Sequence, residues 1–462
     1  MSKLKALSPT EHLFRLITLL FSILYLISCF HKSTTLTYIG AVLLLVMVAR
    51  SFPRLKRANM IVYTCLFLAG AALMIWKQAP LSIWATALMK NANLVCLFAF
   101  APMISLPFYY EDYQSELKAV AQTKMRSLLS FCLLVAACSH ILGLLINVAT
   151  LAIIYELLSK QAKLYNADDI FMSTLVRCYS SSGFWSPAWA SMIVITSSTD
   201  ITWLQLIPIG IALSVVFVLI DMATVKLKMI REPDRYPLLT PDEGQVVHWP
   251  KVITMLALAF IMILMIVIFN VVTDWDLMVI IPVVSLLFPL LTALVQKHMK
   301  EYRAGMENYY VTSLNKVQVQ ISLYASAGFL GKALQYSGIG EQLPKLIPDW
   351  LANFHVGLAI CLMLIMMLPA LLGIHPVVTG TALVASFVPE AFGMSQMTFV
   401  LVILVGWLLS TMWSPFCATC TLAAGYCGKQ SWDIGLGMNG IFALVIMVVF
   451  SVISVVIGPI LS

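Results

Sequence analysis

The stretch Met412–Thr419, Met-Trp-Ser-Pro-Phe-Cys-Ala-Thr, has a counterpart far upstream in Phe184–Ser191, Phe-Trp-Ser-Pro-Ala-Trp-Ala-Ser. A shared tripeptide alone arises by chance in a long chain, but other landmarks recur at nearly the same separation. The pairs are Trp185 and Trp413, 228 positions apart, Trp203 and Trp432, 229 apart, and His140 and His375, 235 apart. Several landmarks with one spacing indicate a repeated unit, so we predict two structural repeats over residues 37–223 and 251–462.

Each Trp-Ser-Pro lies inside an apolar run. A proline ring removes a backbone donor and clashes with the preceding helical turn, whereas proline suits the first position of a helix with serine as the cap. We therefore expect broken transmembrane helices over residues 169–198 and 397–426. In this prediction Pro187 and Pro415 begin the second half of each broken helix.

Composition sets the class of protein. Hydrophobic residues make up 61% of the 462 residues, charged residues make up 11%, and the mean hydropathy is +0.94. A water-soluble domain does not have these values, so we predict an all-α polytopic membrane protein. We attribute the net charge of +7 to Lys and Arg of cytoplasmic loops, and we expect the lipid bilayer, not nucleic acid, as the surrounding partner.

The apolar runs predict about eleven transmembrane helices plus two re-entrant hairpins. Residues 1–36 contain an extra N-terminal transmembrane helix, and residues 224–250 form a basic cytoplasmic linker between the repeats. The distribution of Lys and Arg puts the N-terminus in the cytoplasm and the C-terminus outside. Each repeat has an odd number of crossings, so the second repeat should be inverted. The expected location is the plasma membrane, or the inner membrane in a bacterium.

The two predicted hairpins cover residues 127–158 and 353–390. The first apolar run is too long for one crossing and too short for two, which suits a segment that enters the membrane and returns on the same side. We expect His140 near the tip of the first hairpin and His375 at the tip of the second. Ionisable residues inside a membrane are candidates for proton coupling or substrate contact, although a lone histidine can also be a packed core residue.

The helix breaks nominate a binding site. Irregular backbone at membrane depth is tolerated only where it is buried in protein or lines a water-filled cavity. Free N–H groups at the start of each second half-helix favour a carboxylate or another oxyanion. The residues whose hydroxyls or flexible backbone can contact the substrate or a small cation are Ser181, Ser182, Gly183, Ser186, Ser410, Thr411, Ser414 and Thr419. Ser and Thr also serve as packing residues in membrane helices.

Several other residues have two possible roles each. Arg177 can bind the anion, or it can extend to the interface or pair with an acid. Interface positions are expected for Asp221, Lys332 and Glu390. The tryptophans that flank the breaks, which line a cavity or pack, are Trp185, Trp189 and Trp413. The cysteines on the second broken helix, which are packing residues or ligands of a soft metal, are Cys417, Cys420 and Cys427.

Three motifs resemble those of the ion transporter superfamily, which includes divalent anion:sodium symporters, citrate permeases and arsenite permeases. The stretch 329–338, Phe-Leu-Gly-Lys-Ala-Leu-Gln-Tyr-Ser-Gly, is similar to that family's helix ending in a Ser/Thr-Gly turn. Ser186-Pro187-Ala188 and Ser414-Pro415-Phe416 resemble its Gly-Ser/Thr-Pro motif. Gly428-Lys429-Gln430-Ser431-Trp432 is in register downstream, and the layout is similar over almost the whole chain.

The resemblance implies an elevator-type carrier with a dimeric scaffold, in which substrate lies between the hairpin tips and the broken helices. By position, the tip residues are Ser139, His140, His375 and Thr379, and the broken-helix residues are Ser186 and Ser414. Symporters of that family have Ser-Asn-Thr at the tips, whereas here the tips are Ser139-His140-Ile141 and His375-Pro376-Val377. This difference makes a proton an alternative to sodium as coupling ion.

We therefore expect cation-coupled symport of a small organic anion of the carboxylate type, with Na⁺ or H⁺ as coupling ion and no other cofactor. An enzyme is not expected, since no soluble catalytic domain or nucleophile motif is present. Two alternatives remain. One is an integral membrane enzyme acting on a lipid-linked substrate with the two histidines as acid and base, and the other is a passive channel.

Overall fold

Long apolar helices make up most of the chain in the computed structural model, which describes residues 8–55, 57–146, 148–240, 244–273, 275–339 and 347–461. All regular elements within these ranges are helical, and nine stretches among them are long and apolar enough to cross a membrane. The protein is thus an all-α, multi-pass membrane protein. The total of eleven spans, the re-entry of the hairpins and the inversion of the repeats stay predictions.

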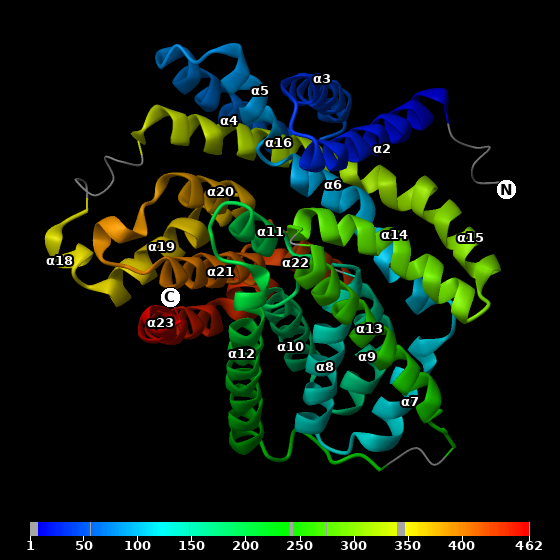
Figure 1. Ribbon diagram of the computed structural model, residues 1–462. Coiled ribbons are helices and arrows are strands. Elements are labelled where there is room, and N and C mark those ends of the chain that lie inside the picture. Colours follow the sequence, from blue (N-terminus) through cyan, green and yellow to red (C-terminus); the bar gives the residue numbers. More distant parts are fainter. Residues whose placement is uncertain are drawn as a thin grey trace.

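The elements of the first half are α2 (Pro9–Phe30), α3 (Thr34–Ser51), η1 (Phe52–Arg54), α4 (Arg57–Trp76), α5 (Leu81–Met89), α6 (Ala92–Phe100), η2 (Ala101–Tyr109), α7 (Tyr113–Lys124), α8 (Leu128–Ile146), α9 (Ala149–Leu164), α10 (Asp168–Ser181), η3 (Ser182–Phe184), α11 (Ala190–Thr196) and α12 (Trp203–Arg231). The N-terminal helices α2 to α5 lie at one side of the molecule in Figure 1, and α12 lies beside α10 and α8.

The elements of the second half are α13 (Trp249–Thr273), α14 (Leu277–Val295), α15 (Met299–Asn308), η4 (Tyr309–Ser313), α16 (Leu314–Ser337), α18 (Asp349–Ala352), α19 (His355–Ala370), α20 (Pro376–Ser386), η6 (Pro389–Phe392), α21 (Gln396–Trp413), α22 (Ala418–Cys427), η7 (Asp433–Met438), α23 (Asn439–Ile457) and η8 (Gly458–Ile460). Helix α16 lies against the N-terminal helices α3, α4 and α5, and α21 packs between α19 and α23.

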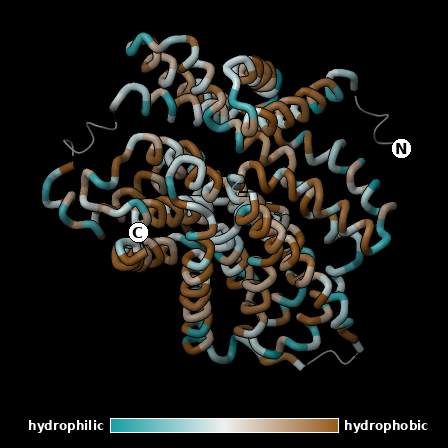
Figure 2. The backbone as a smooth tube through the Cα atoms, viewed as in Figure 1, coloured by the Kyte–Doolittle hydropathy of each residue, from teal (hydrophilic) through white to brown (hydrophobic). Residues whose placement is uncertain are grey.

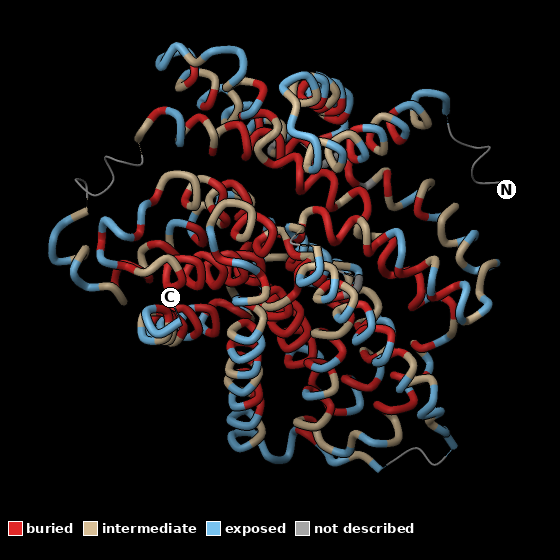
Figure 3. Tube along the Cα trace, in the orientation of Figure 1, coloured by how far each residue is buried: buried red, intermediate tan, exposed pale blue. Residues whose placement is uncertain are grey.

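Helix α21 forms the centre of the molecule. All of its residues after Gln396 are buried, as Figure 3 shows, whereas α12 and α13 are largely exposed. The exposed faces of these outer helices are apolar: Leu219 is 62% exposed and Phe260 65%. In Figure 2 hydrophobic residues predominate along the backbone of α12 and α13. Apolar side chains on the outside and a fully buried helix inside are what a bilayer as solvent requires.

Both predicted helix breaks are present, and their backbones follow one pattern. In the first, the N–H of Ser186 donates to the carbonyl of Ser182 (3.1 Å), and the N–H of Trp189 donates to the carbonyl of Ser186 (3.4 Å). In the second, the N–H of Ser414 donates to the carbonyl of Ser410 (3.1 Å), and the N–H of Cys417 donates to that of Ser414 (3.2 Å). The helix restarts three residues after the proline in both cases. The two Trp-Ser-Pro stretches therefore form the same turn.

The prediction that Pro187 and Pro415 begin the second half-helices was wrong. Helix α11 begins at Ala190 with Trp189 as its N-cap residue, and α22 begins at Ala418 with Cys417 in that position. Each Ser-Pro forms a separate turn before the new helix, because the N–H two residues after the proline bonds back to the serine carbonyl. Of the three prolines predicted to begin a helix after a break, only Pro376 does so, as the first residue of α20.

The segments predicted as hairpins are two pairs of packed helices, α8 with α9 and α19 with α20. His375 lies in the turn before α20, where its Nδ1 accepts from the N–H of Val377 (3.1 Å). The prediction that His140 lies near a tip was wrong, because α8 continues through it to Ile146. The neighbouring Ser139 does not break the helix, since its hydroxyl donates back to the carbonyl of Val135 (2.7 Å).

Helix α5 and the break after it were not predicted. The apolar runs predict spans over Met60–Trp76 and about Asn93–Phe108, whereas the structure has a further helix between them, α5, which ends at Met89 and is followed by α6 from Ala92. Lys90 and Asn91 join the two helices. A lysine inside the apolar stretch Leu81–Tyr109 is unusual.

Two glycines allow the helices after the breaks to approach the broken backbone. A Cβ at Gly210 on α12 would overlap the carbonyl of Phe184, and a Cβ at Gly435 on η7 would overlap the carbonyl of Trp413. The indole Nε1 of Trp203 also donates to the carbonyl of Trp185 (3.0 Å). In each half the next helix therefore packs directly on the turn that interrupts the previous one.

Replacing Gly210 or Gly435 with alanine should therefore displace these turns. We expect each substitution to destabilise the protein by about 1–3 kcal/mol, as overpacking does, measured as a lower midpoint of thermal unfolding in detergent. Gly425→Ala is the matched control, because this helical glycine has no neighbouring atom within 4 Å of an added Cβ. Equal midpoints for the three variants would show that the close approach is not needed.

Candidate functional site

Helix α8 contacts the first break through His140. The Nδ1 of His140 accepts a hydrogen bond from the indole Nε1 of Trp185 (3.2 Å), and its Nε2 lies 3.1 Å from the Oγ of Ser181. An indole N–H can only donate, so Nδ1 is unprotonated and Nε2 carries the proton of a neutral imidazole. The ring thus connects the end of α10 with the turn that follows it.

The pair α19–α20 contacts the second break in a corresponding way. The hydroxyl of Ser414 donates to the carbonyl of Ala370 (2.6 Å) at the end of α19 and accepts from the N–H of Phe416 (3.2 Å). The ring of Phe416 lies next to Gly373, whose φ of +86° suits a residue without a side chain. Each helix pair therefore packs against the break of its own half of the chain.

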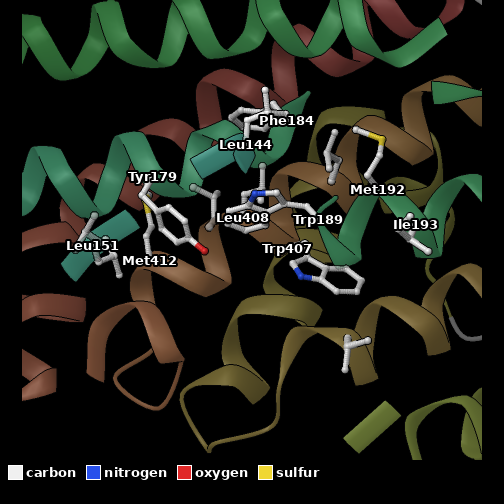
Figure 4. Close-up of a cluster of buried hydrophobic side chains, with 14 of the residues drawn as sticks. Leu144, Leu151, Tyr179, Phe184, Trp189, Met192, Ile193, Trp407, Leu408 and Met412 are labelled. Carbon is white, nitrogen blue, oxygen red and sulfur yellow. The ribbon is translucent and has the colours of Figure 1, made fainter. Parts of the chain in front are cut away.

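The two breaks also approach each other. The hydroxyl of Thr411 on α21 lies 3.4 Å from that of Ser180 on α10. Helix α11 packs against both α20 and α21. In Figure 4 the side chain of Trp189 from the first break lies beside Leu408 and near Trp407, both from α21. Discontinuous elements from both halves thus meet in one buried region.

Most of the hydroxyls predicted to hold a coupling ion are used within their own helices. Ser181 and Ser182 donate to carbonyls one turn earlier, those of Cys178 (3.1 Å) and Tyr179 (2.7 Å). Thr411 donates to the carbonyl of Leu408 (2.7 Å). Ser410 lies within α21 and donates to the carbonyl of Gly406 (2.7 Å). The side chains of Leu408 and Trp189 occupy the space next to the Cα of Gly183. These bonds leave the hydroxyl oxygens, but not their protons, for a ligand.

The remaining predicted residues fall into two groups. Ser139 and Thr379 bond within their own helices, Thr379 through a bond to the carbonyl of Pro376 (3.2 Å). Thr419 is buried in the first turn of α22, directly after the break. No hydrogen bond joins His140 with His375 among the described residues, so the structure does not bring the two histidines together as a bonded pair.

Several buried donors at the breaks have no hydrogen-bond partner in the described part of the chain. They are the hydroxyls of Ser186 and Ser191 and the indole N–H groups of Trp189 and Trp413. Each of these four residues is at least nine-tenths buried. A buried donor without an acceptor lowers the stability of the folded protein by about 1–3 kcal/mol. Both breaks contain such destabilising donors. An unpartnered indole N–H can be satisfied only by an acceptor, for example a ligand oxygen.

Arg177 does not face the breaks. Its guanidinium donates to the carboxylate of Asp221 (2.7 Å), to the side-chain oxygen of Asn439 (2.8 Å) and to the carbonyl of Met438 (2.7 Å), and it lies over the ring of Phe442. The pairing interpretation of Arg177 is therefore correct, whereas the interface position expected for Asp221 is wrong, since this aspartate is fully buried. The cluster joins α10 to α12 and α23.

A metal site is absent from the described residues, because no group of three His, Cys, Asp or Glu side chains is close enough to hold an ion. Cys417 and Cys420 are buried and bond weakly to backbone carbonyls of α21. The packing interpretation of these cysteines is the one that fits.

Sequence reasoning did not identify Ser191, Thr381 or Asn439 as polar groups of the interior. An asparagine inside the apolar run 434–457 was the only local signal for Asn439. Comparison with protein-family models finds no match, and comparison with curated proteins finds none either.

The buried ion pair should be essential for stability. Asp221→Asn removes the charge that compensates Arg177 in a fully buried position, which should cost about 3–5 kcal/mol. Thermal unfolding of the purified protein would report this as a large drop in the midpoint. Glu232→Gln, which breaks the exposed pair with Arg235, is the control and should change nothing measurable. A wild-type midpoint for Asp221→Asn would mean that the cluster does not hold α10 against α12.

Proposed function

We propose that this protein is a secondary active transporter of a small organic anion of the carboxylate type, coupled to a cation gradient. The proposed mechanism is alternating access of the elevator type, as the resemblance to the ion transporter superfamily implies. The observation that carries this proposal is the set of unpartnered buried donors at two matching helix breaks inside a multi-pass membrane protein.

The donors favour an acceptor-rich substrate. Two indole N–H groups and two hydroxyls are available, while the one arginine of the region is fully used by Asp221 and Asn439. Neutral donors in a site without water can bind a carboxylate through hydrogen bonds. No second buried cation, with its cost of desolvation, is then needed. The first turn of α22, where Thr419 lies, adds the positive end of a helix dipole.

A proton is the coupling cation that His140 supports. In the present arrangement its Nδ1 accepts the indole N–H of Trp185. Protonation of Nδ1 would set two donors against each other, so the ring or the indole must move. Proton binding would therefore change the conformation of the first break. Coupling requires such a difference in interaction between the protonated and the unprotonated state. Sodium remains the alternative ion, since the oxygens of Ser180 and Ser181 lie next to the break.

An integral membrane enzyme acting on a lipid-linked substrate is the second candidate. It would need paired acid and base groups at one interface. His140 bonds only within the interior, and His375 caps a helix, so we favour transport.

The direct test is counterflow in proteoliposomes. Proteoliposomes that contain the purified protein and are preloaded with an unlabelled carboxylate mixture should accumulate the corresponding labelled carboxylate. An inward proton gradient should drive net uptake. Ser186→Ala should reduce the rate about tenfold or more without lowering the unfolding midpoint, because its hydroxyl has no bond to lose within the protein. Ser285→Ala is the control, since this buried serine of α14 only bonds back to Ile281 (2.7 Å).

The same assay tests the coupling residue. His140→Gln keeps an acceptor for Trp185 but cannot be protonated, so uptake should lose its dependence on the proton gradient while exchange persists. His355→Gln, at a half-buried histidine bonded to the carbonyl of Phe392, should retain that dependence. Absence of exchange for every carboxylate, with turnover of a lipid substrate instead, would reject transport.

A further inference from the structure

A second polar cluster lies at the break between α5 and α6. Lys90 donates through its Nζ to the hydroxyl of Ser198 (3.3 Å), and Asn93 donates through its side-chain amide to the hydroxyl of Ser197 (3.3 Å). Both serines follow the end of α11. The cluster therefore joins the N-terminal helices to the far end of the first broken helix.

The cluster contains positive charge without a paired acid. Lys90 is half-buried and forms no ion pair with any described residue. Lys332 on α16 lies one turn after Gly328, which Asn91 contacts, and its Nζ donates to the side chain of Gln335 (2.9 Å). The nearest acid along the chain from Ser198 is Asp200, which is exposed and forms no ion pair within the described residues. The charges of both lysines favour an anion beside them.

An unpartnered amide adds a directed donor. The Nδ2 of Asn91 has no hydrogen bond, and the residue is 4% exposed. Asn91 packs against Gly328 on α16, one turn before Lys332 on the same helical face. It also precedes α6, whose first N–H groups provide the positive end of a nine-residue helix. Asn91 and the start of α6 thus directly follow Lys90 in the chain, and Asn91 contacts the helix that carries Lys332.

We propose that Lys90, Asn91 and Lys332 form a binding site for a small oxyanion, a carboxylate or a phosphate, separate from the helix breaks. The seven residues of α11 separate it from the first break, which is about 10 Å at the rise of an α-helix. A cationic group at this distance would concentrate anions beside the transport site. The proposal needs only binding, so it is independent of whether the protein transports its ligand.

Isothermal titration of the full-length protein in detergent tests the site, with sodium phosphate and sodium acetate as the two probes at low ionic strength. We expect saturable binding of at least one probe, and the stronger one distinguishes phosphate from carboxylate chemistry. Lys90→Gln should weaken binding about tenfold or more, because a charged hydrogen bond is lost. Lys332→Gln should weaken it less, and Lys90→Arg should retain binding.

A control makes the result specific. Lys160→Gln, at an exposed lysine of α9, should bind as the wild type does. A monodisperse elution profile and a wild-type unfolding midpoint establish that each variant is folded. The proposal is overturned if the wild type binds neither probe or if Lys90→Gln binds with unchanged affinity. Lys90-dependent binding without counterflow would reject only the transport function, and counterflow with binding that does not depend on Lys90 would reject only this site.

Discussion

The structure depends on satisfying backbone groups where a helix is interrupted inside an apolar protein. A Ser-Pro turn frees carbonyl and N–H groups that lipid cannot partner, so protein must surround both breaks. Here the turn bonds to itself between Ser186 and Trp189 and between Ser414 and Cys417. Trp203 and the close approach of α12 and η7 cover the exposed carbonyls. The burial of α21 follows from this requirement, since it leads directly into one of the breaks.

Once the breaks are enclosed, polar side chains of the interior divide into two kinds. Arg177, Asp221 and Asn439 bond to one another and to backbone carbonyls, and they connect three helices. Ser186 and Trp413, by contrast, are buried without partners. A network in which every buried polar group has a hydrogen-bond partner is rigid. Buried donors without partners favour the binding of a ligand that supplies acceptors. This contrast separates the structural cluster from the proposed substrate site within one region of the molecule.

The sequence alone was sufficient to locate both breaks, because proline inside an apolar run has few structural outcomes and the same motif occurs twice. It was not sufficient to place His140, since Ser139 and His140 are compatible with a continuous helix and only the packing of α8 decides. The pairing of Arg177 with Asp221 has no local signal, because the two residues come from different helices. Helix α5 was not predicted, because its nine residues are too few to cross a membrane and were assigned to a connection between two spans.

The central claim is that the two broken helices meet in the interior, and a cysteine cross-link tests it most directly. Ser180→Cys and Thr411→Cys replace hydroxyls that lie 3.4 Å apart, in a variant with a protease site in the loop between α12 and α13. After oxidation in membranes and cleavage, the two halves should stay joined until a reductant is added, and each single variant should separate. Separation of the halves in the double variant would contradict the account.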